Sequence, residues 1–132
     1  MVQLEVARRM AASRGTKDYA AYAALVQLLA EVRIAHKVSP NVFDPPPRVY
    51  SAVVDMERRR PGLEPTEYRG VKNLVLAVFR SRRKRLVNNL PEPTRVEAPR
   101  ALISLGHGPD ARAEELGPED FVALYRAVAG TL

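Results

Sequence analysis

The six residues from Arg80 to Arg85 have side chains that could do chemistry, because five of the six are positively charged. Two asparagines follow them closely. Guanidinium groups and side-chain amides both form good hydrogen bonds with phosphate oxygens, so this segment is a candidate binding site for a polyanion. A solvated basic surface and a nuclear localisation signal are the other interpretations of such a run. The candidate nucleic-acid-binding residues are Arg80, Arg82, Arg83, Lys84, Arg85, Asn88 and Asn89.

The sequence pattern predicts a helix over residues 81–90, which would place Arg82, Arg85 and Asn89 on one side. Its N-terminus would lie inside the basic run, where free backbone N–H groups favour anions. The charge distribution also favours a polyanionic partner. Residues 58–100 carry twelve Lys/Arg against four Asp/Glu, in a chain of net charge +6. A positive field this concentrated attracts phosphate polymers.

Other catalytic and metal-binding patterns are weak. The chain has no cysteine, which excludes a disulfide framework, a thiolate zinc site and a cysteine nucleophile among its residues. His36 and His107 lie far apart, and neither has a second ligand at metal spacing. Ser13 and Ser51 have no histidine nearby, and there is no glycine-rich phosphate loop. The sequence therefore predicts no metal site and contains no complete active site. Since no apolar run approaches the roughly 20 residues that cross a bilayer, we expect a cytoplasmic protein.

Three consecutive prolines, Pro45–Pro47, follow Phe43 and Asp44. Proline fixes φ near −65° and lacks a backbone donor, so neither a helix nor a central strand can run through this segment. It is predicted to be a stiff, extended connection that holds Phe43 in a fixed place ahead of a strand. One interpretation is a loop stiffened for stability, with Phe43 as a core side chain.

The elements that must position these residues change type near residue 60. Before the charged break at Arg58–Gly62, periodicity predicts two helices and then two strands, which suit an antiparallel pair at one side of a sheet. After it, the period becomes helical, and Thr66 is the expected N-cap of the first helix. The expected helices cover residues 3–13, 18–26, 66–79, 81–90, part of 95–105 and a final segment from Pro118; the strands cover 32–38 and 49–57.

The first half is too small to enclose a core of its own, because isolated ribbons are marginal in water. Residues 1–57 are therefore predicted to be the last piece of a larger sheet. The expected fold is an α+β fragment: the end piece of a larger sheet (residues 1–60), followed by a small all-α domain (residues 61–132). Self-association through the exposed sheet edge is one way in which that edge could be covered.

Several blocks of the sequence resemble the ribosomal RNA adenine dimethyltransferases, and most closely the bacterial small-subunit (16S) branch. They occur in the family's order and span nearly the whole chain. The blocks are Met1–Arg9, Gly15–Tyr19, Val38–Val54, Phe79 with Arg82–Lys84 and Leu86–Leu90, and Arg112–Leu116 with Phe121.

The resemblance covers only the second half of that family. It implies that residues 1–60 are the end piece of a Rossmann-like methyltransferase sheet and that residues 61–132 are the helical rRNA-binding domain. The family's S-adenosylmethionine loop and its Asn-Leu-Pro-Tyr motif would lie upstream of Met1, so the resemblance implies that no cofactor binds this chain and that it is inactive alone. It also implies that Phe43, in the Phe-x-Pro-x-Pro motif, stacks on a flipped-out target adenine. The resemblance further implies that Arg82, Arg83 and Lys84 contact ribosomal RNA in the small subunit. The family usually has glycine and then Leu-Ser after Tyr19, where this chain has Ala20–Ala23.

Three other functions remain open at this level. The chain could be a ribosome-docking or assembly module without catalysis, or a helix-turn-helix DNA binder built from residues 66–90. Within the family, the alternative is a large-subunit rRNA methyltransferase of the antibiotic-resistance type; the Arg112–Leu116 block and the longer helical tail favour the small-subunit branch.

Overall fold

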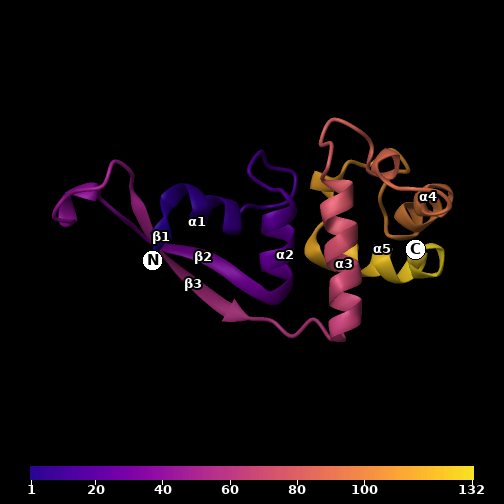
Figure 1. Ribbon diagram of the computed structural model, residues 1–132, viewed down its shortest axis with the longest axis horizontal. Coiled ribbons are helices and arrows are strands. Elements are labelled where there is room, and N and C mark those ends of the chain that lie inside the picture. Colours follow the sequence, from indigo (N-terminus) through magenta and orange to yellow (C-terminus); the bar gives the residue numbers. More distant parts are fainter. The chain divides into compact units, whose positions relative to one another are not determined.

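The computed structural model describes residues 1–132 and divides into two compact units (Figure 1). We call Met1–Pro61 the sheet unit and Gly62–Leu132 the helical unit. The division falls inside the charged, proline- and glycine-containing segment at residues 58–62. None of the α-helices combines the length and hydropathy that a membrane span requires.

The sheet unit contains a three-stranded antiparallel sheet in the order β1-β3-β2. The expected antiparallel pair is confirmed: β2 and β3 pair from Ala30 opposite Arg58 to Val38 opposite Ser51, with a bulge between Ile34 and His36. Helix α1 packs against both long strands, and α2 packs against α1 and β2 (Figure 1). The elements are β1 (Val2–Gln3), α1 (Leu4–Met10), α2 (Ala21–Leu29), β2 (Ala30–Val38) and β3 (Ser51–Arg58).

The core of the sheet unit is built mainly from small residues and one large aromatic. Tyr19 is completely buried, although it precedes α2 rather than lying in it. Gln27 of α2 donates from Nε2 to the carbonyls of Met10 and Ala12, at 3.0 and 2.7 Å, and so satisfies acceptors that the end of α1 leaves unpaired. The predicted helix over 3–13 therefore stops at Met10, and Gly15 makes its left-handed turn, at φ 81°, beyond it.

The helical unit packs α3 and α4 against α5. The apolar stripe predicted on the first helix is confirmed, since Val71, Leu74, Val75 and Val78 are all buried. At its end Phe79 meets Phe121 of α5, with ring centroids 5.8 Å apart. The elements are α3 (Pro65–Val78), a 3-10 turn (Leu86–Asn89), α4 (Thr94–Ser104), a 3-10 turn (Ala113–Glu115), α5 (Pro118–Val128) and a 3-10 turn (Ala129–Thr131).

Two local predictions in this unit are wrong. Thr66 does not cap α3; the N-cap is Glu64, and Pro65 takes the first helical position, where its missing N–H costs nothing. The helix expected over residues 81–90 does not form. Residues 80–85 are an irregular loop, and only Leu86–Asn89 make a 3-10 turn. Arg82, Arg85 and Asn89 therefore do not share a helix face, and the basic run has no helix N-terminus.

Prolines act differently in the two later helices. Pro118 starts α5 at a first-turn position, as the sequence predicts. Pro99 lies inside α4, whose start precedes it at Thr94. A helix tolerates the lost backbone bond there because α4 buries Ala98, Ala101 and Leu102 in the core.

Glu67 and Arg126 connect α3 to α5 in a way that should depend on pH. Arg126 Nε donates to Glu67 Oε2 over 3.1 Å, and this hydrogen bond holds the pKa of the Glu67 carboxyl below its usual value. A group with a lowered pKa stabilises the fold above its unfolded-state pKa and loses that contribution as pH falls through the folded-state pKa. We expect Glu67→Gln to reduce the loss of stability between neutral and acidic pH, measured as urea midpoints. If the midpoint falls by the same amount in the variant, the ion pair does not have this role.

Candidate nucleic-acid interface

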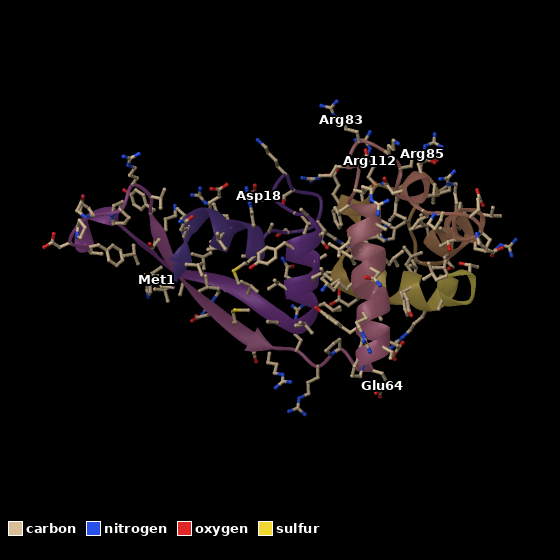
Figure 2. All side chains as sticks on the ribbon, in the orientation of Figure 1. Met1, Asp18, Glu64, Arg83, Arg85 and Arg112 are labelled. Atoms are coloured by element: carbon tan, nitrogen blue, oxygen red, sulfur yellow. The ribbon has the colours of Figure 1, made fainter.

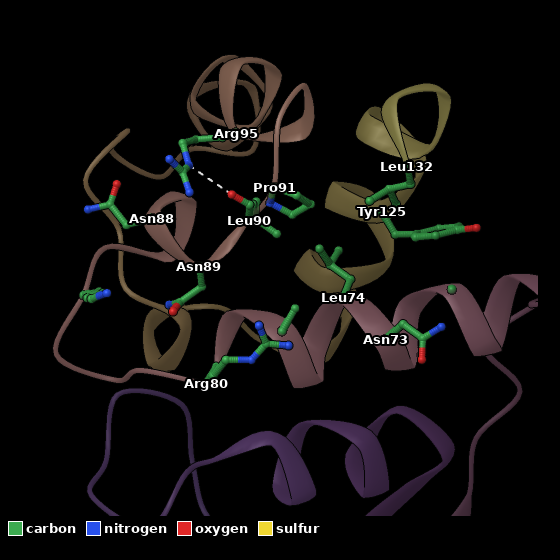
Figure 3. Close-up of a pocket in the computed structure, with 13 residues that line it drawn as sticks. Asn73, Leu74, Arg80, Asn88, Asn89, Leu90, Pro91, Arg95, Tyr125 and Leu132 are labelled. Atoms are coloured by element: carbon green, nitrogen blue, oxygen red, sulfur yellow. Dashed lines mark hydrogen bonds between the residues drawn. The ribbon is translucent and has the colours of Figure 1, made fainter.

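A groove of about 720 Å³ lies within the helical unit, between α3, the segment that follows it, and α5 (Figure 3). Its lining combines cations, amides and an apolar floor, and no carboxylate side chain belongs to it. The lining residues are Gly70, Asn73, Leu74, Ala77, Arg80, Lys84, Asn88, Asn89, Leu90, Pro91, Arg95, Tyr125 and Leu132.

Helix α3 forms one wall of the groove through a single stripe of residues. Gly70, Asn73, Leu74 and Ala77 follow the i, i+3, i+4, i+7 spacing that places side chains on one helix face. This stripe lies next to the buried stripe, and Leu74 belongs to both. Tyr125 of α5 packs directly on Gly70, where the atoms of an added Cβ would overlap the phenol ring. Glycine at this position therefore lets the phenol ring lie directly against α3.

The loop over residues 80–85 turns back because Asn89 holds it to the end of α3. Asn89 Nδ2 donates to the carbonyl oxygens of Val78 and Ser81, at 3.1 and 3.2 Å. Leu86 and Leu90 on either side of the 3-10 turn are buried and anchor the segment in the core. Arg80 and Lys84 are thereby brought to the groove from the two ends of the loop.

Replacing Asn89 by alanine should destabilise the helical unit by about 1–3 kcal/mol, because two hydrogen bonds of about 0.5–1.5 kcal/mol each are lost. Asn88→Ala is the matched control, since Asn88 is exposed and adjacent. Urea unfolding of both variants measures the difference. Equal stabilities for the two variants would show that Asn89 does not hold the loop.

The structure separates the predicted basic residues into three groups. Arg82 Nη2 forms an ion pair with Glu114 Oε2 at 2.7 Å, and Arg85 Nη1 pairs with Asp110 Oδ1 at 2.9 Å. Arg83 is exposed, outside the groove lining, and pairs with no carboxylate. Of the predicted nucleic-acid-binding residues, the ones that line the groove are Arg80 and Lys84, together with the amides Asn88 and Asn89.

A second segment, which contains Ala111, lies beside the end of the loop. The N–H of Leu86 donates to the Ala111 carbonyl over 2.8 Å, so Arg85 and Arg112 flank adjacent stretches of chain. Figure 2 shows Arg83, Arg85 and Arg112 at the same end of the helical unit. The acidic residues there, Asp110 and Glu114, neutralise part of the run that the sequence alone presents as uniformly positive.

Sequence reasoning missed three groove residues: Asn73, Arg95 and Tyr125. Asn73 is an exposed polar side chain beside the apolar stripe of α3. Arg95 belongs to the first turn of α4, and its Nε donates to the Leu90 carbonyl over 3.0 Å, which orients the guanidinium along the groove wall (Figure 3). Tyr125 lies in α5, where its place in the helical pattern gives no sign of a binding role. Arg80, Lys84 and Arg95 together make the groove cationic.

Phe43 lies in the connection between β2 and β3, outside the core of the sheet unit. Its side chain is half-buried, whereas the three prolines after it are exposed. Its N–H donates to the Pro40 carbonyl over 3.2 Å, and Ser39 Oγ accepts from the Asn41 N–H, so the turn before it is ordered by local bonds. The strand after the prolines begins at Ser51, two residues later than predicted.

The two histidines have structurally different surroundings. His107 Nε2 lies 3.0 Å from Asp120 Oδ2, an oxygen that also accepts the Gly117 N–H at the start of α5. His36 is exposed on β2, next to the bulge. The His107–Asp120 pair therefore has a capping role in α5 that its residue types alone would not indicate.

Comparison with known proteins gives consistent results. A family model described as ribosomal RNA adenine dimethylase matches residues 1–129. "Ribosomal RNA small subunit methyltransferase A" of Rubrobacter xylanophilus is 69% identical over 129 residues, covering 98% of this chain and 48% of the relative. The protein of the same name from Halothermothrix orenii is 43% identical, covering 88% of this chain and 40% of the relative. The chain thus spans about half the length of the curated relatives it matches.

Two solved structures have the same fold over most of this chain. The crystal structure of a dimethyladenosine transferase from Plasmodium falciparum matches with a TM-score of 0.79 and 23% identity, and covers 94% of this chain and 54% of that one. At this identity it shows the fold alone. The 23S rRNA methyltransferase ErmE matches with a TM-score of 0.68 and 26% identity, and covers 96% of this chain and 52% of that one.

Proposed function

Because this chain belongs to the ribosomal RNA adenine dimethylase family, we propose that it supplies the rRNA-binding part of an enzyme that dimethylates two adjacent adenines of small-subunit ribosomal RNA. The observation that carries the proposal is the set of unpaired cations Arg80, Arg83 and Lys84 on the helical unit, two of which line a groove that no Asp or Glu side chain lines. The 69% identity to a small-subunit methyltransferase favours that branch over the large-subunit one.

The two units would divide the work. In this proposal residues 1–60 belong to the methyltransferase domain and residues 61–132 bind ribosomal RNA. The helical unit contains the whole cationic groove and the loop beside it, which supports assigning RNA contact to it. The proposed partner is the small ribosomal subunit in the cytoplasm, with Arg82 and Arg85 contributing to the surface through their ion-paired guanidinium groups.

Phe43 is proposed as one wall of the target-adenine pocket. A half-buried aromatic ring on an ordered turn, followed by three prolines, is held with little freedom and stays partly exposed. Stacking a flipped-out base on such a ring contributes roughly 1–3 kcal/mol and helps to offset unstacking. No second wall is assigned to any residue of this chain.

The residues present do not fit S-adenosylmethionine. The strands of the sheet unit are all antiparallel, and its one positive-φ glycine, Gly15, is isolated rather than part of a glycine-rich loop between a parallel strand and a helix. We therefore expect calorimetry of this chain with S-adenosylmethionine to detect no binding. Tight binding would show that a second copy, paired through the sheet edge, or a different surface completes a cofactor site.

Competition binding tests the RNA assignment. We expect a labelled RNA from the 3′ end of the small-subunit rRNA to bind more tightly than duplex DNA of the same length. The slope of log K against log salt should be about −0.7 for each single-strand phosphate contact. A clear preference for duplex DNA would overturn the proposal in favour of a DNA-binding helical domain. Binding to rRNA without any contribution to methylation in the longer relatives would favour a ribosome-docking module.

A further inference from the structure

We propose that the groove of the helical unit holds one unstacked nucleotide from a single-stranded RNA segment, with its phosphate at Arg80 and Lys84 and its base over the apolar floor. This inference rests on the proposed rRNA binding and deepens it. It specifies which form of RNA is bound and which residues hold it.

The size and floor of the groove suit a base. A volume of about 720 Å³ falls within the roughly 300–1,000 Å³ of small-ligand sites. Leu74, Ala77, Leu90 and Pro91 supply apolar surface that a phosphate group would not use. A nucleobase has two apolar faces, and bases that are free of a duplex stack readily on protein surfaces. Bases inside a duplex are stacked on their neighbours and cannot enter such a groove.

The cations are placed for a phosphate beside that floor. Arg80 and Lys84 are exposed, and neither forms an ion pair. Arg95 uses its Nε for the Leu90 carbonyl, which leaves its terminal nitrogens as the donors that can face the groove. In Figure 3 the Arg80 and Arg95 side chains lie on either side of Asn89 and Leu90. Three positive side chains and no Asp or Glu among the lining residues make the site complementary to a polynucleotide backbone.

The amides and the tyrosine supply contacts that a phosphate-only site does not need. Asn73 and Asn88 are exposed amides, each with a donor and an acceptor that can pair with the edge of a base. Tyr125 lines the groove with its ring packed on Gly70. Since glycine lets the ring lie close to α3, the ring has a defined position from which it can stack with a base.

The test uses the full 132-residue chain and two labelled probes, single-stranded hexaadenylate and a 12-base-pair RNA duplex, followed by fluorescence anisotropy. Lys84→Ala and Lys72→Ala are matched variants, because each removes one exposed lysine from the helical unit and only Lys84 lines the groove. We expect Lys84→Ala to weaken hexaadenylate binding about fivefold at about 0.1 M salt and Lys72→Ala to leave it nearly unchanged.

Tyrosine variants test the base contact. We expect Tyr125→Ala to weaken hexaadenylate binding by at least about fivefold and duplex binding little, with Tyr22→Ala, an exposed tyrosine of the sheet unit, as the control. If Tyr125→Ala does not fold, Gly70→Ala replaces it. Its added Cβ displaces the ring while alanine favours the helix, so hexaadenylate binding should fall without loss of stability.

Each outcome decides between the two proposals. Equal losses in Lys84→Ala and Lys72→Ala, or equal affinity for hexaadenylate and the duplex, overturn the nucleotide site while rRNA binding stands. Binding of hexaadenylate that responds to Lys84→Ala but to neither Tyr125→Ala nor Gly70→Ala reduces the groove to a phosphate site, which also overturns the inference. Failure to bind both the probes and small-subunit rRNA removes the proposed function itself.

Discussion

Reversing the charges of Arg80, Arg83 and Lys84 together should lower the affinity for small-subunit rRNA by about two orders of magnitude at about 0.1 M salt. Three lost phosphate contacts reduce the slope of log K against log salt by about 2, at about 0.7 per contact. These three residues are chosen because they have no ion pair, whereas reversing Arg82 would place a carboxylate beside Glu114 and disturb folding. The measurement is a salt titration of anisotropy for the variant Arg80→Glu, Arg83→Glu, Lys84→Glu.

The matched control carries the same change in net charge elsewhere on the helical unit. Arg69, Lys72 and Arg100 are exposed and lie outside the groove lining, so their reversal should leave the salt slope nearly unchanged. A comparable loss of affinity in both triple variants would mean that only the overall field of the protein matters. It would then remove the loop over residues 80–85 from the proposed interface.

Phe121→Ala should destabilise the helical unit by about 3–5 kcal/mol, which is a large part of the roughly 5–15 kcal/mol that stabilises a typical domain. Phe121 is 1% exposed, and its ring meets Phe79 at the end of α3, just before the basic loop begins. Loss of the ring leaves a cavity where α5 supports that end. Urea unfolding followed by helical circular dichroism measures the effect.

Phe121→Leu is the matched variant, since it keeps an apolar side chain and most of the volume. We expect it to cost less than about 1.5 kcal/mol plus the roughly 0.5–1.5 kcal/mol of the aromatic contact. If Phe121→Ala loses less than about 1 kcal/mol, the ring does not support the core as its burial indicates. RNA binding by Phe121→Leu should remain close to that of the unsubstituted chain.

Long periodic elements were predictable from the sequence. The apolar stripe of α3, the start of α5 at Pro118 and the antiparallel pairing of β2 with β3 all follow from repeating patterns of burial, and all are confirmed. The ends of the helices were predicted less accurately. The end of α1 depends on a partner distant in sequence, since Gln27 satisfies its carbonyls. The start of α3 depends on Pro65, which takes the first helical position ahead of Thr66.

The helix predicted for the basic run was the largest local error. Residues 81–90 have a helical pattern of apolar positions, yet Asn89 bonds back to the Val78 and Ser81 carbonyls and holds the segment in a loop. A side-chain hydrogen bond of this kind competes with the backbone ladder of a helix, and no periodicity can reveal it. The loop matters for the site because it brings Arg80 and Lys84 to one groove.

The sequence by itself determined that the chain concentrates positive charge in residues 58–100, that it belongs with rRNA adenine dimethylases, and that it changes from a sheet to helices near residue 60. These properties depend on composition, periodicity and ordered motifs. Only the tertiary structure decided which charges are neutralised by Asp110 and Glu114 and which line a groove with Tyr125. The physical reason is that ion pairing and the lining of a groove require side chains to meet in space, and such meetings join residues up to several tens of positions apart.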